Sequence, residues 1–311
     1  MITAVSLFSG IGGIDIAFKQ AGFDVIWAND IDRYACITYR NNFTSDLSEA
    51  DIGKVNAEVV PKSDVIFAGF PCQSFSVMGY KRGFKDPRGN LFFEIARIAK
   101  RTKPKVIFLE NVKNLIYHDS GKTFITMYNT LAELGYYVKY CVQNAKTHGN
   151  IPQERSRTFI MAFSDYDMMR LFKFPNEIPL TVGIDDILNR SLKQKDMFYY
   201  LPKNKYYDTL NHKIPDITGI YRIDDSGIAM KKYLLSPTLK ANMGTYPDRV
   251  PIIRDDFGIR KLTPYECLAL QGFPNEFRFK DIPLEAAYKQ CGNTVCVPVV
   301  KRIADNIYKV F

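Results

Sequence analysis

The chain has 311 residues, of which 46% are hydrophobic, so it can bury a large core in one big domain with a smaller one beside it. Its 42 Lys and Arg against 33 Asp and Glu give a formal charge of +9, which favours a polyanionic partner without identifying one. The six cysteines form no CxxC pair and there are three histidines, which excludes a disulfide-rich secreted class and argues against a metal site. The sequence shows no signal peptide and no membrane-spanning run, so we expect a cytoplasmic protein without a membrane partner.

Apolar runs alternate with amphipathic stretches through the first half of the chain. The predicted strands are 2–8, 23–28, 65–69, 106–109, 136–142 and 158–163, and the predicted helices are 14–21, 33–41, 90–101 and 123–134. This alternation predicts an α/β fold, a doubly wound mixed sheet of the Rossmann-like type.

From 181 to 257 the composition shifts toward Tyr, Lys, Pro, Asp and Gly, with many turn signals, which predicts a separate smaller module. Regular structure returns at Thr263, which can cap a helix together with Glu266, while Pro264 occupies the first turn. A final helix is predicted from Val297 to Tyr308.

A glycine-rich loop, Phe8-Ser9-Gly10-Ile11-Gly12-Gly13, follows the first strand directly, and Asp30 ends the next strand. Glycine lets a backbone approach a ligand closely, and a strand-end carboxylate can accept hydrogen bonds from ribose hydroxyls. Asp15 stands where a dinucleotide fingerprint has its third glycine, so S-adenosylmethionine is a better candidate than NAD. A tight turn followed by a solvated acid is the alternative.

Two further strand ends carry reactive side chains. The strand at 65–69 runs into Pro71-Cys72, and the strand at 106–109 ends in Glu110. Ligands bind at the carboxyl ends of such strands, so Cys72 is a candidate nucleophile and Glu110 a candidate acid in one cleft. A buried structural cysteine and a surface acid are the alternatives.

Arg155 and Arg157 lie two residues apart, and in an extended chain both point to one face. This arrangement predicts contacts to a phosphate or a base, with a solvated basic face as the alternative.

In their order and spacing these segments resemble the DNA cytosine-5 methyltransferase family of bacterial restriction-modification systems, over nearly the whole chain. The matching blocks are 8–13, 29–30, 51–52, 69–76, 86–92, 110–112, 153–157, 260–274 and 290–295.

The resemblance implies that Cys72 attacks carbon 6 of a flipped-out cytosine while Glu110 hydrogen-bonds the ring, and that Arg155 and Arg157 help to hold the base. Carbon 5 then takes the methyl group of S-adenosyl-L-methionine, which leaves as S-adenosyl-L-homocysteine, and no metal takes part. The implied cofactor-binding residues are Phe8, Gly10, Ile11, Gly12, Asp30, Ile31, Asp51, Ile52, Pro71, Leu91, Asn293 and Thr294.

The resemblance also implies a division into domains. Residues 1–180 and 290–311 would form the catalytic domain, 181–262 the target recognition domain, and 263–289 a hinge and connecting helix region. The partners would be double-stranded DNA and, within the same system, a cognate restriction endonuclease; we expect a monomer. The implied DNA contacts are Gln73, Ser76, Arg88, Thr238 and Leu239.

Two positions depart from the family pattern. Asp30 stands where the family usually has Glu, and Ile31 replaces an aromatic residue. Three other functions stay open from the sequence: a transfer-RNA cytosine methyltransferase, a catalytically silent DNA-binding protein, and a nicotinamide oxidoreductase. Intact Cys72 and Glu110 argue against the second, and the absent third glycine argues against the third.

Overall fold

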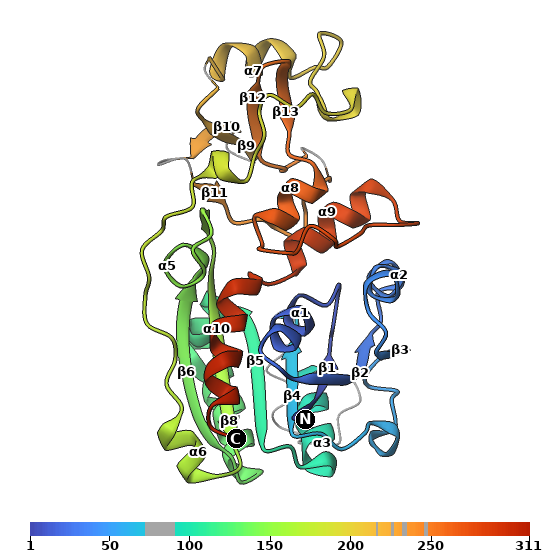
Figure 1. Cartoon of the computed structure of the whole chain (residues 1–311), viewed down its shortest axis with the longest axis vertical. Helices are drawn as coiled ribbons and strands as arrows, with labels where there is room; N and C mark the ends of the chain where they lie inside the picture. Colours follow the sequence, from blue (N-terminus) through green and yellow to red (C-terminus); the bar gives the residue numbers. More distant parts are fainter. Residues whose placement is uncertain (72–90, 216, 225–226, 232–234, 246–247) are drawn as a thin grey trace. The chain divides into compact units, whose positions relative to one another are not determined.

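The structure is a computed structural model, and it describes residues 1–71, 91–215, 217–224, 227–231, 235–245 and 248–311 (Figure 1). The chain divides into two compact units. Unit 1 comprises Met1–Gln143, Ser156–Asn176 and Val299–Phe311, and unit 2 comprises Asn144–Arg155 and Glu177–Pro298. The sequence-based boundaries differ from this division, because they assign 144–155 to the catalytic domain and 263–289 to a hinge.

Unit 1 is built on a seven-stranded sheet in the order β3-β2-β1-β4-β5-β8-β6. Strands β1 to β5 are parallel to one another, and β8 runs antiparallel to β5, so the sheet is mixed as predicted. The bounds are β1 Thr3–Leu7, β2 Asp24–Asp30, β3 Asp46–Glu49, β4 Val65–Gly69, β5 Val106–Val112, β6 Tyr137–Asn144 and β8 Ser156–Phe163.

Helices cover both faces of this sheet, because alternate residues of its central strands are apolar on both sides (Figure 1). On one face Phe18 of α1 packs against Phe67 and Phe108, with ring centroids 4.6 and 5.3 Å apart. On the other face Ile66 and Ile107 belong to a core that includes residues of α3 and α4. The helices of unit 1 are α1 Gly13–Gln20, α2 Arg33–Asn42, α3 Leu91–Thr102, α4 Lys122–Glu133, α6 Tyr166–Leu171 and α10 Val297–Tyr308, whose first two residues belong to unit 2, with the 3-10 segments η1 Ala57–Val59 and η4 Lys113–Gly121.

Unit 2 contains an antiparallel four-stranded sheet in the order β10-β9-β12-β13, over a small core that includes Leu210, Ile214 and Ile252. Thr263 and Glu266 form the predicted capping box, with Pro264 in the first turn. The bounds are β7 Gln153–Glu154, β9 Ile220–Asp224, β10 Gly227–Lys231, β11 Ser236–Pro237, β12 Ile252–Asp255, β13 Gly258–Lys261, α5 Ala145–Gly149, α7 Tyr207–Lys213, α8 Pro264–Ala269, α9 Leu284–Asn293, η5 Ile184–Asp186 and η6 Asp196–Phe198.

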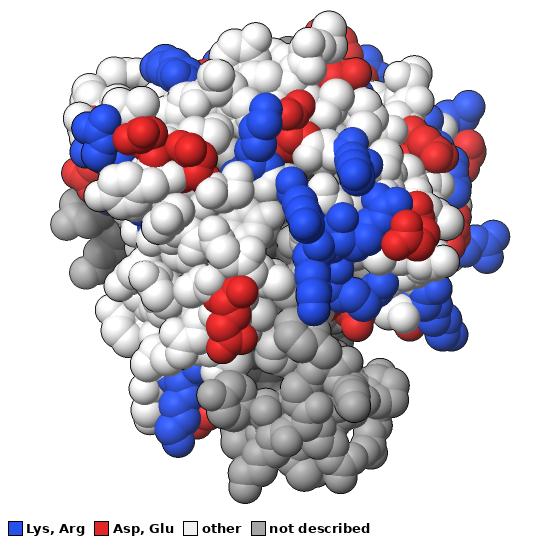
Figure 2. Space-filling view, turned by 90° about the horizontal axis from the view of Figure 1, so that it is seen from below, with Lys and Arg blue, Asp and Glu red and all other residues white. Residues whose placement is uncertain are grey.

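The positive charge of the chain is not spread evenly. Figure 2 shows Lys and Arg gathered in one area of the face seen from below, with both signs interspersed elsewhere. Exposed lysines stand near the amino ends of β4 and β5, at Lys62, Lys103 and Lys105. Within the described ranges, no helix is both long and apolar enough to cross a membrane.

Candidate active site

The loop after β1 is held in an unusual backbone conformation. Phe8, Gly10 and Gly12 have φ angles of 54°, 54° and 80°, all in the left-handed region. This region suits the two glycines but costs Phe8 of the order of 1 kcal/mol. Such strain concentrates where a backbone has to present its polar groups to a ligand.

Asp30 at the end of β2 shapes this loop. One carboxylate oxygen accepts a hydrogen bond from the amide of Gly10 at 2.7 Å, and the other accepts from the amide of Asp32 at 2.8 Å. Burial raises the pKa of Asp30, and these backbone donors counteract part of that effect. Each oxygen keeps a second lone pair, which can accept from ribose hydroxyls. The adjacent Ile31 is 67% exposed, an apolar surface open to the flat face of a base.

The next strand end brings Asp51 to the same edge of the sheet. The Asn29 amide donates to the carbonyls of Ser48 and Ala50, both at 2.9 Å, and so ties the end of β3 to β2. Asp51 follows directly, half-buried. In contrast, the side chains of Ile11 and Ile52 are buried in unit 1, so these two residues can serve a ligand through their backbone only. Leu91 is half-buried at the start of α3.

Glu110 on β5 pairs in register with Gly69, the last residue of β4. Its Oε1 lies 3.1 Å from Nε of Arg157, and the two side chains are 10% and 16% exposed. A glutamate and an arginine shielded in this way hold each other in a fixed orientation. An acid and a cation therefore stand beside the strand end from which the Pro-Cys segment leaves.

Asn111 fixes the start of that segment. Its Nδ2 donates to the carbonyl of Phe70 at 2.8 Å, and its Oδ1 accepts from the amide of Val112 at 2.8 Å. Phe70 is buried, whereas Pro71 is exposed. The structure thus shows where the chain emerges toward Cys72. The predicted residues Cys72, Gln73, Ser76 and Arg88 lie outside the described residues.

Arg155 and Arg157 have different partners. Arg155, in unit 2, is 2% exposed, and its guanidinium donates to the carbonyls of Leu239, Gly292 and Thr294 at 2.8, 3.2 and 2.5 Å. Arg157, in unit 1, faces Glu110. The resemblance led us to expect that both arginines hold the base. In the structure the Arg155 guanidinium binds backbone carbonyls inside unit 2.

The predicted contacts in unit 2 are also partly internal. Thr238 donates to the carbonyl of Glu154, and Leu239 is 1% exposed, so its side chain is buried rather than presented to DNA. Asn293, predicted to line the cofactor pocket, is the exposed last residue of α9, and Thr294 caps that helix and is buried. A Cβ on the preceding Gly292 would lie 2.1 Å from the backbone of Lys240. The segment at Lys240 therefore passes α9 so closely that a side chain at position 292 would clash with it.

Two groups that shape this edge have no role that the sequence patterns predicted. The Asn111 amide is one: it lies in the matching block 110–112, but its acceptor at Phe70 is distant in sequence. The second is the carboxylate of Asp15, considered only as a missing glycine. It is fully buried and accepts hydrogen bonds from Tyr39 and Ser6.

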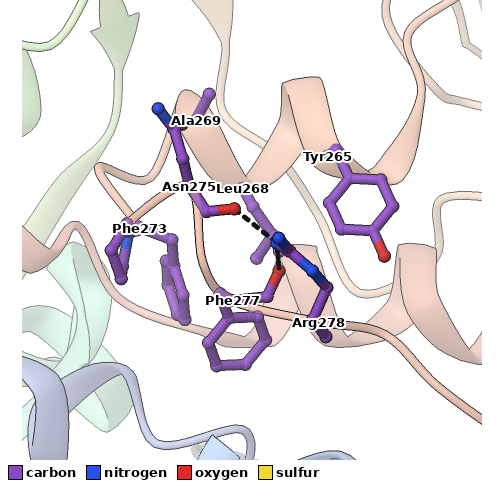
Figure 3. Close-up of a pocket in the computed structure, with 8 residues that line it drawn as sticks. Tyr265, Leu268, Ala269, Phe273, Asn275, Phe277 and Arg278 are labelled. Atoms are coloured by element: carbon purple, nitrogen blue, oxygen red, sulfur yellow. Dashed lines mark hydrogen bonds between the residues drawn. The ribbon is translucent and has the colours of Figure 1, made fainter.

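A pocket of about 370 Å³ lies within unit 2, and none of the residues that line it is a predicted site residue (Figure 3). Aromatic rings of Tyr265, Phe273 and Phe277 surround it, and the Arg278 guanidinium donates to the carbonyls of Asn275 and Phe277. The Arg278 charge at its rim is thus already engaged by the backbone. This pocket offers no reactive group and we assign it no part in the chemistry.

A family model described as C-5 cytosine-specific DNA methylase matches residues 2–309. The chain is 47% identical over 312 residues to the Type II methyltransferase M.Bsp6I of Bacillus sp. (strain RFL6), covering 99% of both. It is 35% identical over 310 residues to the Type II methyltransferase M.HhaI of Haemophilus parahaemolyticus, covering 97% of this chain and 93% of that one.

Among solved structures, a variant of the DNMT2 protein of Spodoptera frugiperda aligns with a TM-score of 0.76 at 20% identity, covering 99% of this chain and 100% of that one. A putative DNA modification methyltransferase from an E. coli prophage aligns at 0.70 with 22% identity, covering 100% of this chain and 99% of that one. These two likenesses bear out the predicted fold.

Proposed function

Because this chain belongs to the C-5 cytosine-specific DNA methylase family, we propose that it methylates carbon 5 of a flipped-out cytosine in a short duplex DNA site. The observation that supports the assignment most directly is the shielded Glu110–Arg157 pair, in which Glu110 stands opposite Gly69 at the end of the strand that leads to Cys72.

We assign the cofactor site to the carboxyl ends of β1, β2 and β3. The left-handed loop at Phe8 to Gly12, the Asp30 carboxylate, the exposed Ile31 and the half-buried Asp51 together offer backbone amides, ribose acceptors and an apolar face. This set fits S-adenosyl-L-methionine, which would supply an electrophilic methyl group. Asn293 and Thr294 remain proposed contributors from unit 2.

In the proposed mechanism the thiolate of Cys72 adds to carbon 6 of the cytosine ring. Protonated Glu110 donates a hydrogen bond to ring nitrogen 3 and accepts one from the exocyclic amine, so that the electron pair displaced from the carbon 5–carbon 6 bond by this addition makes carbon 5 nucleophilic. After carbon 5 has been methylated, its proton leaves to a base, the carbon 5–carbon 6 double bond re-forms, and the Cys72 thiolate departs. Arg157 keeps Glu110 in place, while Arg155 has a supporting role through unit 2.

The target base has to leave the duplex first, which costs a few kcal/mol by the general rule for base flipping. We propose that unit 2 provides the recognition surface, because it contains the basic and aromatic stretch that follows residue 181. By analogy with the Type II methyltransferases it matches, we further propose that the chain protects DNA from a cognate restriction endonuclease.

Transfer of a tritiated methyl group to duplex DNA and to transfer RNA, measured side by side, tests the substrate. We expect incorporation into DNA, and incorporation into RNA alone would overturn the assignment. A duplex with 5-fluorocytosine at the target tests the covalent step, since fluorine cannot leave as the proton does. Wild-type protein should form a stable adduct with this duplex, and Cys72→Ala should form none while it still binds the DNA.

A further inference from the structure

A buried polar cluster joins three elements beneath the cofactor loop. Asp15 on α1 is fully buried; its Oδ1 accepts from the Tyr39 hydroxyl on α2 at 2.7 Å, and its Oδ2 accepts from the Ser6 hydroxyl on β1 at 3.0 Å. Tyr39 is also fully buried. Buried charged groups are weak evidence of a purely stabilising role, because apolar residues of similar volume are often tolerated in their place.

An aromatic stack connects this cluster to the loop. The Tyr39 ring stacks on Phe43, with centroids 4.4 Å apart and an interplanar angle of 24°. The Phe43 ring fills the space beside Gly12, where a Cβ would come within 2.3 Å of it. The Lys19 ammonium lies 5.1 Å from the centroid of the same ring. Phe43 is therefore held in the position that closes one side of Gly12.

The loop is held at a second point by the segment that leads into the same helix. Asp30 accepts from the Gly10 amide, and Asp32, two residues later, is the N-cap of α2. Gly10 is thus secured by the last residue of β2, two residues before the N-cap of α2, and Gly12 is secured by Tyr39 and Phe43 at the end of α2. The two ends of the loop are therefore fixed by the segments on either side of α2.

We propose that Tyr39 and Asp15 form a positioning pair that keeps the loop in its cofactor-binding conformation and thereby sets the affinity for S-adenosylmethionine. This inference rests on the proposed cofactor site. Apparent affinity falls in proportion to the fraction of molecules whose loop is competent, so loosening the loop raises the dissociation constant. The pair has no described contact with Glu110 or Arg157, so the chemical step is left intact once the cofactor is bound.

Tyr39→Phe removes the hydroxyl and keeps the ring stacked on Phe43. We expect the Kd for S-adenosylhomocysteine, measured by calorimetry, and the KM for S-adenosylmethionine to rise roughly five- to tenfold. The kcat at saturating cofactor and the KM for DNA should stay unchanged. Asp15→Asn retains an oxygen that accepts from Tyr39, so its effect on Kd should be smaller.

Tyr136→Phe is the matched control. Tyr136 is also a buried tyrosine of unit 1, and its hydroxyl donates to the carbonyl of Pro104 at 2.8 Å, outside the contacts of the cofactor loop. It should lose stability much as Tyr39→Phe does, with no change in Kd. Equal affinities in Tyr39→Phe and Tyr136→Phe would overturn the positioning role.

A second variant covers the case in which Tyr39→Phe does not fold. Phe43→Leu changes a half-buried side chain and removes the stack on Tyr39, and it should raise the Kd in the same direction. Unchanged affinity in this variant would equally overturn the inference. Failure of the wild-type chain to bind S-adenosylhomocysteine at all would instead refute the proposed cofactor site, so the two failures are distinguishable.

Discussion

The Nε atom of Arg157 lies 3.1 Å from Oε1 of Glu110, across the antiparallel strands β8 and β5. With 16% and 10% of their side chains exposed, the two groups are largely protected from solvent screening. The pair orients a carboxylate at the end of β5, where the neighbouring strand β4 continues into the Pro-Cys segment.

Glu110→Gln should lower kcat by about 10²- to 10⁴-fold, the range for loss of a positioned acid–base group. Glutamine has almost the same shape, so affinity for DNA and for S-adenosylhomocysteine should change little. Single-turnover methyl transfer measures the first quantity and titrations measure the second. A variant that retained the wild-type rate would remove Glu110 from the mechanism.

Arg157→Ala should lower kcat as well, because Glu110 loses the guanidinium that orients it, while the chain stays folded. Arg157→Lys keeps the charge but not the planar fork, so its rate should lie between those of wild type and Arg157→Ala. The comparison uses the same single-turnover assay. Identical rates for the Lys and Ala variants would show that charge at this position contributes nothing.

Arg155→Met should act on stability rather than on chemistry. The carbonyls of Leu239, Gly292 and Thr294 would lose a shared donor inside unit 2, at a cost of roughly 2–4 kcal/mol. Denaturant unfolding measures this loss. Arg170→Met, at a surface arginine whose side chain is 61% exposed, is the control and should stay within about 0.5 kcal/mol of wild type.

Asp15 should make stability depend on pH. Burial raises the pKa of Asp15 from 3.8 to about 6, partly offset by hydrogen bonds from Tyr39 and Ser6 and by the charge of Lys19. Between these values the folded chain holds a proton that the unfolded chain has lost. The free energy of unfolding should therefore fall, by roughly 2–3 kcal/mol, as the pH rises from about 4 to 6.

Asp15→Asn removes this titration, so the difference in unfolding free energy between wild type and variant should change over that pH interval and be flat above it. Urea unfolding at closely spaced pH values measures the difference. Parallel curves would mean that Asp15 titrates normally in the folded chain.

Sequence patterns predicted the framework of unit 1 well, because its strands and helices carry strong period-2 or helical apolar patterns. The strand at 65–69 and the last helix agree with the structure to the residue. Strand β3 was missed, since its sequence Asp-Leu-Ser-Glu is polar and it pairs only at the sheet edge. Helix α9, at Leu284–Asn293, had no predicted bounds, since the prediction gave only a hinge and connecting helix region over 263–289.

For the site too, some residues could be placed from the sequence and the contacts of others could not. Asp30 and Glu110 could be placed from the sequence, because strand ends of one parallel sheet meet at one edge. Asp51 came from the family resemblance alone, since the strand before it was not predicted. The partners of Arg155 and Arg157 could not, since two arginines so close in the chain belong to different compact units. Burial of Leu239 was likewise invisible, because it depends on pairing between β11 and β7, distant in sequence.

The proposed recognition role of unit 2 bears on the construction of hybrid enzymes. An exchange of 177–298 with a relative would leave 144–155 behind, although Arg155 in that short stretch binds carbonyls within the exchanged part. A graft that ignored it would bury a guanidinium against a foreign backbone. A transplant that keeps these contacts therefore has to move two separate pieces of the gene, one of them only twelve codons long.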